Sequence, residues 1–87
     1  MASYSVLIKT SAAKELEAVE PRAARVRSVS RIQDLAQNPR PRGSQKLAGE
    51  AERYRIRRGA YRIVYSVDDE QRIVDVVQVG HRRDVYR

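Results

Sequence analysis

The sequence predicts an α+β fold in which an antiparallel sheet carries a helical hairpin on one face. Residues 53–67 alternate apolar and polar side chains in steps of two around a Gly-containing break, which is typical of two half-buried strands joined as a hairpin. Residues 10–37 instead space their apolar side chains by three or four positions, as amphipathic helices do. The resulting order is β-α-α-β-β-β, and the short connections near its end favour an antiparallel meander.

The chain begins with a predicted strand and a short predicted helix. The strand covers residues 4–8, and its core-facing side chains are Tyr4, Val6 and Ile8. Thr10 or Ser11 is suited to cap the helix, which is expected to run to about residue 19. The buried face of this helix is expected to carry Ala12, Leu16 and Val19.

Pro21 fits the first turn of a second helix, which is expected to run to about residue 37. Its apolar positions are Val26, Val29, Ile32 or Gln33, and Leu35 or Ala36. Its other face carries Arg22, Arg25 and Arg31. We expect the two helices to form an αα-hairpin whose apolar stripe packs on the sheet.

The connectors and the last strand follow from composition. Residues 38–44 contain two prolines and several cations, so this segment is expected to be a basic, solvated loop. Residues 45–52 are expected to form a second irregular connector, and residues 68–71 an acidic turn. Residues 72–79 are rich in Val and Ile, which predicts the most buried strand of the sheet, ended by Gly80.

The alternation in the central hairpin separates two surfaces. The apolar row contains Tyr54, Ile56, Tyr61, Ile63, Tyr65 and Val67. The opposite row contains Arg55, Arg57 and Arg62. Guanidinium groups held on a rigid sheet match the geometry of phosphate oxygens, so this row is a candidate phosphate-binding surface.

Composition limits the function classes. The 87-residue length predicts a single domain, and the net charge of +7 favours an anionic partner such as nucleic acid or an acidic protein. There is no cysteine and one histidine, so we expect neither a disulfide, a metal site nor a cofactor. No apolar run approaches the ~20 residues of a membrane span and no signal peptide follows Met1, so a cytoplasmic protein without a membrane partner is expected.

The remaining chemistry centres on the arginines. The four glycines are isolated, so there is no Gly-rich phosphate loop, and no Ser-His-Asp arrangement is apparent. RNA can be cleaved without a metal when the ribose 2′-OH attacks the adjacent phosphate, which requires a base, an acid and cations for the developing charge. Arginine serves the last of these roles well, but it stays protonated and is a poor base.

Three runs resemble the RelE branch of the RelE/ParE toxin superfamily: residues 54–57 (YRIR), 59–65 (GAYRIVY) and 79–86 (VGHRRDVY). The chain length and the predicted order of elements agree, so the similarity covers the whole chain as a single RelE-like toxin domain. The resemblance implies the toxin of a type II toxin–antitoxin system, a ribosome-dependent and metal-independent mRNA endoribonuclease that inhibits translation. The implied partners are a RelB-like antitoxin, mRNA, ribosomal RNA, and operator DNA only through the antitoxin complex.

The resemblance also implies roles for single residues. Arg62 matches the arginine that stabilises charge at the scissile phosphate, and Arg82 the arginine near the leaving group. Tyr86 matches a tyrosine that stacks on a base or takes part in proton transfer. Arg55 and Arg57 stand where some members have lysines, and because arginine keeps its proton we expect them only to grip phosphate.

Proton transfer would then fall to His81 or Tyr86, and the unperturbed pKa of histidine suits that role. The expected catalytic residues are therefore Arg62, Arg82, Tyr86 and His81. The expected RNA-binding residues are Arg55, Arg57, Arg58 and Arg83.

Two other functions stay open at this point. A ParE-like toxin would poison DNA gyrase without cleaving anything, and it would share the fold. An inactive superfamily member would only bind its antitoxin. The match at Tyr86 and the dense arginines of the hairpin favour the nuclease.

Overall fold

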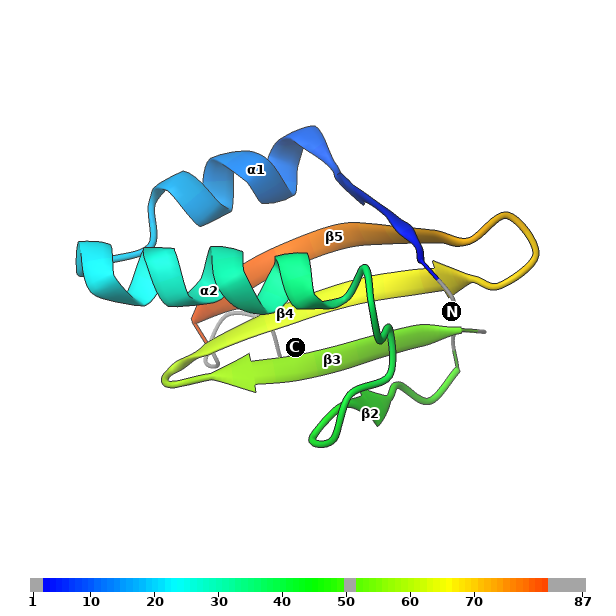
Figure 1. The fold of residues 1–87 in the computed structure, drawn as a ribbon. Helices are drawn as coiled ribbons and strands as arrows, with labels where there is room; N and C mark the ends of the chain where they lie inside the picture. The colour runs from blue at the N-terminus through cyan, green and yellow to red at the C-terminus, as the bar shows by residue number, and fades with distance from the viewer. Residues whose placement is uncertain (1–2, 50–51, 82–87) are drawn as a thin grey trace.

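In the computed structural model, two helices lie on one face of a five-stranded sheet (Figure 1). The structure describes residues 3–49 and 52–81. The elements are β1 (Ser5–Ile8), α1 (Thr10–Glu17), α2 (Arg22–Asp34), β2 (Gln45–Lys46), β3 (Arg53–Arg58), β4 (Tyr61–Asp68) and β5 (Ile73–His81). The predicted α+β class with a helical pair on one face is confirmed.

The strand order in the sheet is β1-β5-β4-β3-β2. Strands β3, β4 and β5 form the predicted antiparallel meander, whereas β1 pairs in parallel with β5 and makes the sheet mixed. A parallel neighbour requires a crossover connection, and between β1 and β5 the chain passes through both helices and through β2, β3 and β4. The prediction that the last strand is the most buried is wrong, because β4 is the central strand with a long neighbour on each side.

Two predicted boundaries along the sheet also change. Gln45 and Lys46 form the short strand β2, which pairs with β3 and replaces part of the predicted irregular connector. Gly80 does not end the last strand, because it pairs with Arg62 and the strand continues to His81. Both differences depend on pairing partners rather than on local pattern.

The helices begin and end near the predicted positions. Thr10 is the first residue of α1 rather than its cap; Lys9 occupies the cap position and makes no side-chain capping bond. Pro21 likewise precedes α2 instead of lying in its first turn. The second helix ends at Asp34, shorter than predicted. Helix ends fray and are the least predictable part of a helix.

The core lies between the helices and the sheet. The helices contribute Ala12, Leu16, Val19, Ile32 and Leu35, and the strands contribute Tyr54, Ile56, Ile63, Tyr65, Val67, Val74, Val76 and Val79. Two predicted core residues are instead exposed: Val26 is 56% exposed and Ile8 39% exposed. Val26 lies outside the stripe that packs on the sheet, and Ile8 is the last residue of an edge strand. None of the helices among the described residues is long and apolar enough to cross a membrane.

Ser28 occupies a core position on α2 that an apolar residue would normally fill. Its side chain is fully buried, and its Oγ has no hydrogen-bond partner within the described residues. A buried hydroxyl without a partner costs about 1–3 kcal/mol, and serine is also a poorer helix former than alanine.

We therefore expect Ser28→Ala to raise the free energy of unfolding by about 1 kcal/mol. Urea denaturation measures the change. Ser30→Ala, at an exposed position of the same helix, controls for helix propensity alone and is expected to gain about half as much or less. Equal gains in the two variants would show that the buried hydroxyl costs nothing.

The loop after α2 is mostly exposed, as its composition predicts, but it is also fastened to the rest of the fold. Pro39 is buried, and its carbonyl oxygen accepts a 2.7 Å hydrogen bond from the Tyr65 hydroxyl. Arg40 binds both Asp69 and Glu52 with Nη2···O distances of 2.8 and 2.7 Å, and its Nε donates to the Tyr54 hydroxyl at 2.8 Å. The guanidinium also lies 5.1 Å from the centre of the Tyr54 ring. These contacts fasten the loop to β3 and to the β4–β5 turn.

The ion pair between Arg40 and Asp69 predicts a pH dependence of stability. Hydrogen bonds from Arg40, and then from the Tyr4 hydroxyl, lower the pKa of the Asp69 carboxyl below its usual range. A carboxyl whose pKa is lower in the folded state stabilises that state above the unfolded-state pKa, and this contribution is lost as the pH falls through the folded-state pKa.

We expect Asp69→Asn to melt below the unchanged chain at pH 6, with the difference in Tm shrinking as the pH falls below about 4. Thermal melts between pH 3 and pH 7 measure this difference. Glu70→Gln, an exposed position in the same turn, controls for the loss of one negative charge. A Tm difference that does not change with pH would contradict the assignment.

Candidate nucleic-acid interface

The arginines of the hairpin lie on the sheet face that points away from the helices. Arg57 pairs directly with Arg62, and Arg55 pairs with Val64. The alternate residues of the same strands, Ile56 and Ile63 among them, pack in the core below the helices. The prediction that Arg55, Arg57 and Arg62 share one surface is therefore confirmed. We call these three residues the arginine row.

Burial differs along the arginine row. Arg55 is 6% exposed and Arg62 is 5% exposed, whereas Arg57 is exposed. Arginines are almost never this deeply buried without interactions, and both make contacts within the chain. Two of the three arginines are therefore largely shielded from solvent and have interactions within the chain. A group that is already ordered loses little conformational entropy when it binds an anion.

The direct pairing of Arg57 with Arg62 is electrostatically unfavourable. Side chains opposite each other in an antiparallel pair have Cβ atoms about 4.5–5.5 Å apart, and like charges at that distance destabilise the sheet. An anion bound between the two guanidinium groups would remove the repulsion. The arrangement is thus suited to a phosphate group, which accepts bidentate hydrogen bonds from arginine.

His81 lies on the other side of the sheet. It pairs with Tyr61, and the two rings meet edge to face with their centres 5.7 Å apart. Tyr61 packs against the helix-covered core, and His81 lines a small cleft together with Glu15 of α1. The structure therefore does not bring His81 together with Arg62, whose neighbour on β5 is Gly80.

The side chains of the other predicted site residues are not described by the structure. Arg82, Arg83 and Tyr86 lie outside the described residues, and for Arg58 the structure describes only its backbone at the end of β3. Their roles remain predictions. Within residues 3–49 and 52–81, no three His, Cys, Asp or Glu side chains come together in a way that would hold a metal ion.

Glu15 is a residue near the site that the sequence did not single out. Its Oε1 accepts a 2.9 Å hydrogen bond from the backbone N–H of Val79 in β5. Strand β1 pairs with β5 only as far as Val76, so this N–H lies beyond the end of the neighbouring strand. Glu15 thereby fastens the part of β5 that carries His81 and leads toward Arg82. No sequence pattern marks a contact between residues so far apart in the chain.

Comparisons with known proteins agree with this geometry. Residues 6–86 match the family described as the ParE toxin of the type II toxin–antitoxin system parDE. Toxin RelG of Mycobacterium tuberculosis is 33% identical over 84 residues, which cover 97% of each chain.

Solved structures show the same fold. The toxin–antitoxin complex RelBE2 of M. tuberculosis matches with a TM-score of 0.78 and 33% identity, covering 92% of this chain and 99% of that chain. The archaeal RelE–RelB complex of Pyrococcus horikoshii matches with a TM-score of 0.82 and 29% identity, covering 94% and 98%. The family match and the RelG relative both extend over nearly the whole sequence. The chain therefore belongs to the RelE/ParE superfamily of toxins of type II toxin–antitoxin systems.

Proposed function

We propose that the chain is a ribosome-dependent, metal-independent mRNA endoribonuclease that acts in the cytoplasm and inhibits translation. The observation that carries this proposal is the arginine row, where Arg57 faces Arg62 directly and Arg55 stands buried beside them. Like charges held together on a rigid sheet favour a ligand with concentrated negative charge. A phosphodiester of RNA is such a ligand, and it is the target that the resemblance to the RelE branch implies.

In the proposed reaction, the ribose 2′-OH attacks the adjacent phosphorus and the 5′-oxygen of the next nucleotide leaves. Negative charge increases on the phosphoryl oxygens as the pentacoordinate transition state forms. Arg62 and Arg57 would stabilise that charge with hydrogen bonds that strengthen in the transition state. Arg55, Arg58 and Arg83 would hold the flanking RNA backbone, and Arg82 would stabilise the leaving oxygen.

Proton transfer requires a group other than the arginines. The arginines stay protonated at any physiological pH, so they do not act as the base. The contact of His81 with Tyr61 on the helix-covered side supports a greater role for Tyr86 than for His81. The 2′-OH must lose a proton and the leaving 5′-oxygen must gain one, and we propose Tyr86 for this proton transfer, with His81 as the alternative.

The proposed partners follow from the relatives. RelE structures from M. tuberculosis and P. horikoshii were solved as complexes with their antitoxins, which supports a RelB-like antitoxin for this chain. Ribosomal RNA and mRNA are the proposed targets of the free toxin. Operator DNA would be bound only through the antitoxin complex.

A second candidate function is inhibition of DNA gyrase without any cleavage. The description of the matching family as a ParE toxin favours it. The buried arginines argue for the nuclease instead, since a surface that only docks on a protein does not require guanidinium groups held at 5–6% exposure on a sheet.

One experiment separates the two candidates. The chain is expressed from an inducible promoter, the 5′ ends of cellular mRNA are mapped, and purified chain is added to a gyrase supercoiling assay. New 5′ ends at a constant phase within codons, confined to translated regions, are the expected result. Unchanged transcripts together with inhibited supercoiling would reject the nuclease in favour of the gyrase inhibitor.

A further inference from the structure

Strand β5 contains one extra residue shortly before its end. Val64 of β4 pairs with Gln78 of β5. The next residue of β4, Tyr65, pairs with Val76, so Val77 is an additional residue on β5. This arrangement is a β-bulge, which bends a strand and re-aims the side chains that follow it. Bulges are common next to active sites, so the residues after Val77 are of interest.

The bulge decides which residue of β5 lies beside Arg62. Val76 is buried under the helices, and an unbroken alternation would continue with Gln78 and Gly80 on that face. Instead Val79 is the next core residue, and Gly80 pairs with Arg62. Directly paired residues of antiparallel strands lie on the same face of the sheet. On the face that points away from the helices, which we call the outer face, the β5 neighbour of Arg62 therefore has no side chain.

Gly80 also lies at an edge of the sheet. Strand β1 pairs with β5 only as far as Val76, so within the described residues no strand lies beyond Gly80. On its other side, Arg62 has Arg57 of β3 as its partner. Arg62 is thus bordered by a long cationic side chain on one side and by bare backbone on the other. The shortest way from the edge of the sheet to Arg62 crosses a residue without a side chain.

The backbone conformation of Gly80 does not require a glycine. Gly80 has the extended backbone of a strand. A positive φ is found in three other glycines of the described residues: Gly43, Gly49 and Gly59. Glycine weakens the interior of a strand, because it loses much conformational freedom on folding and has no side chain to pack. Folding therefore does not explain a glycine here, whereas the close approach of another molecule to the backbone does.

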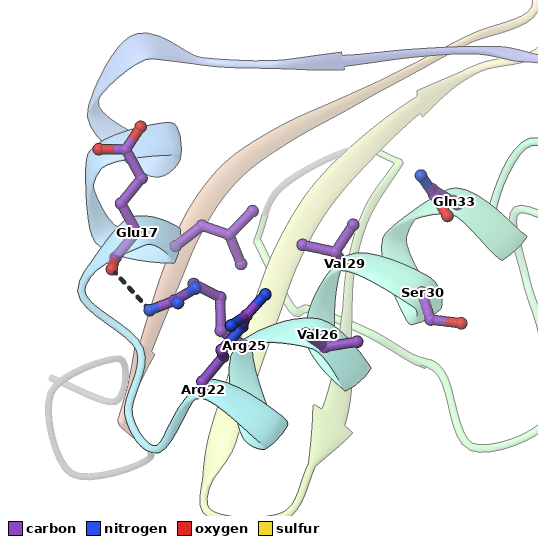
Figure 2. A pocket seen from close by; sticks show the side chains of 8 residues that line it. Glu17, Arg22, Arg25, Val26, Val29, Ser30 and Gln33 are labelled. Atoms are coloured by element: carbon purple, nitrogen blue, oxygen red, sulfur yellow. Dashed lines mark hydrogen bonds between the residues drawn. The ribbon is translucent and has the colours of Figure 1, made fainter.

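Contacts on the helix side hold the end of β5 in place. Glu15 of α1 accepts a 2.9 Å hydrogen bond from the N–H of Val79, the residue before Gly80. The end of α1 is in turn fastened to α2, because Arg25 Nη1 donates to the backbone oxygen of Glu17 at 3.4 Å (Figure 2). These contacts resist a shift of β5 toward the helices. A side chain added at Gly80 would therefore project from the outer face.

We propose that Gly80 is a substrate-binding residue, over whose backbone an RNA strand crosses the edge of the sheet and places a phosphate at Arg62. The bulge at Val77 brings this glycine to the outer face, and the missing side chain lets the RNA approach the strand closely. The inference rests on the mRNA endoribonuclease proposed above for its chemistry. The close approach of RNA to Gly80 can nevertheless be measured without cleavage.

Larger side chains in place of Gly80 test the proposal. Single-turnover cleavage of mRNA on purified ribosomes is expected to fall about tenfold in Gly80→Ala and about 10²-fold in Gly80→Val, because added methyl groups displace the phosphate from Arg62. The Tm of Gly80→Ala is expected to equal or exceed that of the unchanged chain, because alanine restricts the unfolded state more than glycine does. Lost cleavage at full stability distinguishes a blocked substrate from a damaged fold.

Ser66→Val is the matched control. Ser66 lies on the same strand and the same face as Arg62, four residues further along, which corresponds to roughly 13 Å. The variant places a side chain of the same shape on the outer face and is expected to cleave at nearly the unchanged rate. Full activity of Gly80→Val, or equal losses in Gly80→Val and Ser66→Val, would overturn the inference.

A second measurement does not depend on catalysis. A trinucleotide with 2′-O-methyl riboses lacks the attacking hydroxyl, so it stays intact while its binding to the isotope-labelled chain is followed by NMR titration. Gly80→Val is expected to weaken this binding about tenfold, and Ser66→Val to leave it nearly unchanged. Equal affinities of the two variants and the unchanged chain would overturn the inference. If mRNA stays intact while trinucleotide binding still depends on Gly80, the nuclease proposal fails and this inference stands.

Discussion

Replacing Arg62 by alanine is expected to reduce mRNA cleavage by about 10²–10³-fold, the usual effect of removing one donor that stabilises transition-state charge. Arg62 is the member of the arginine row that is both nearly buried, at 5% exposure, and paired directly with a second arginine. Its side chain is therefore largely shielded from water, which strengthens its attraction to an anion. Mapping 5′ ends of a single reporter mRNA at several time points measures the effect.

Three variants make this result specific. Arg62→Lys keeps the charge but loses the planar pair of donors, so an intermediate rate is expected. Arg42→Ala removes one positive charge from an exposed loop position and is expected to cleave at nearly the unchanged rate. His81→Gln, at the same end of the sheet but on its other face, is expected to retain most of the activity. If His81→Gln were as inactive as Arg62→Ala, His81 rather than Tyr86 would be the residue that transfers the proton.

The second large effect is expected at Tyr65, in the middle of the core. Its side chain is 0% exposed, its ring stacks on Tyr54 with the centres 5.9 Å apart, and its hydroxyl donates to the Pro39 oxygen. Burial raises the pKa of this phenol to about 12, so it stays protonated and remains a donor. Tyr65→Ala is expected to lower the free energy of unfolding by about 3–5 kcal/mol.

That loss is a large fraction of the total stability of a small domain, which for 87 residues is roughly 4–13 kcal/mol. Tyr65→Phe isolates the hydroxyl and is expected to cost about 1–3 kcal/mol, because it leaves the Pro39 carbonyl without its partner. Tyr61→Phe is the matched control: among the described residues that hydroxyl makes 3.4 Å contacts with the backbone of Glu20, and its loss is expected to cost little. Guanidinium denaturation measures all three. If Tyr61→Phe and Tyr65→Phe were equally costly, the loop contact would not be stabilising.

The hairpin was predictable because its alternation fixes which face each side chain takes. A register slip of one residue would move the whole apolar row out of the core, so the period alone decides that Arg55, Arg57 and Arg62 share a surface. The wrong prediction that Val26 lies in the core has a different cause. A helix contains several apolar positions, and which of them meets the sheet depends on packing. Ser28 is therefore buried on this helix, whereas the more hydrophobic Val26 is exposed.

Other features depend on contacts between residues distant in sequence. The parallel pairing of Ser5 with Ile73 leaves no trace in either strand, because a strand has the same period whichever neighbour it joins. In the sequence, Arg40 is one of several cations in a loop predicted to be solvated. Only the fold places Asp69 and Glu52 beside it. The burial of Arg62 likewise comes from tertiary structure, and no property of its own strand predicts it.

The carboxylate of Glu15 has a consequence for the behaviour of this toxin at high concentration. Within the described residues, β5 continues past the end of β1, so part of its edge has no strand beside it. Such open edges attract strands of other chains and promote aggregation. A charged side chain that occupies the Val79 N–H takes away a bond which an incoming strand would need. Pairing of a second chain along this edge is therefore disfavoured at Val79.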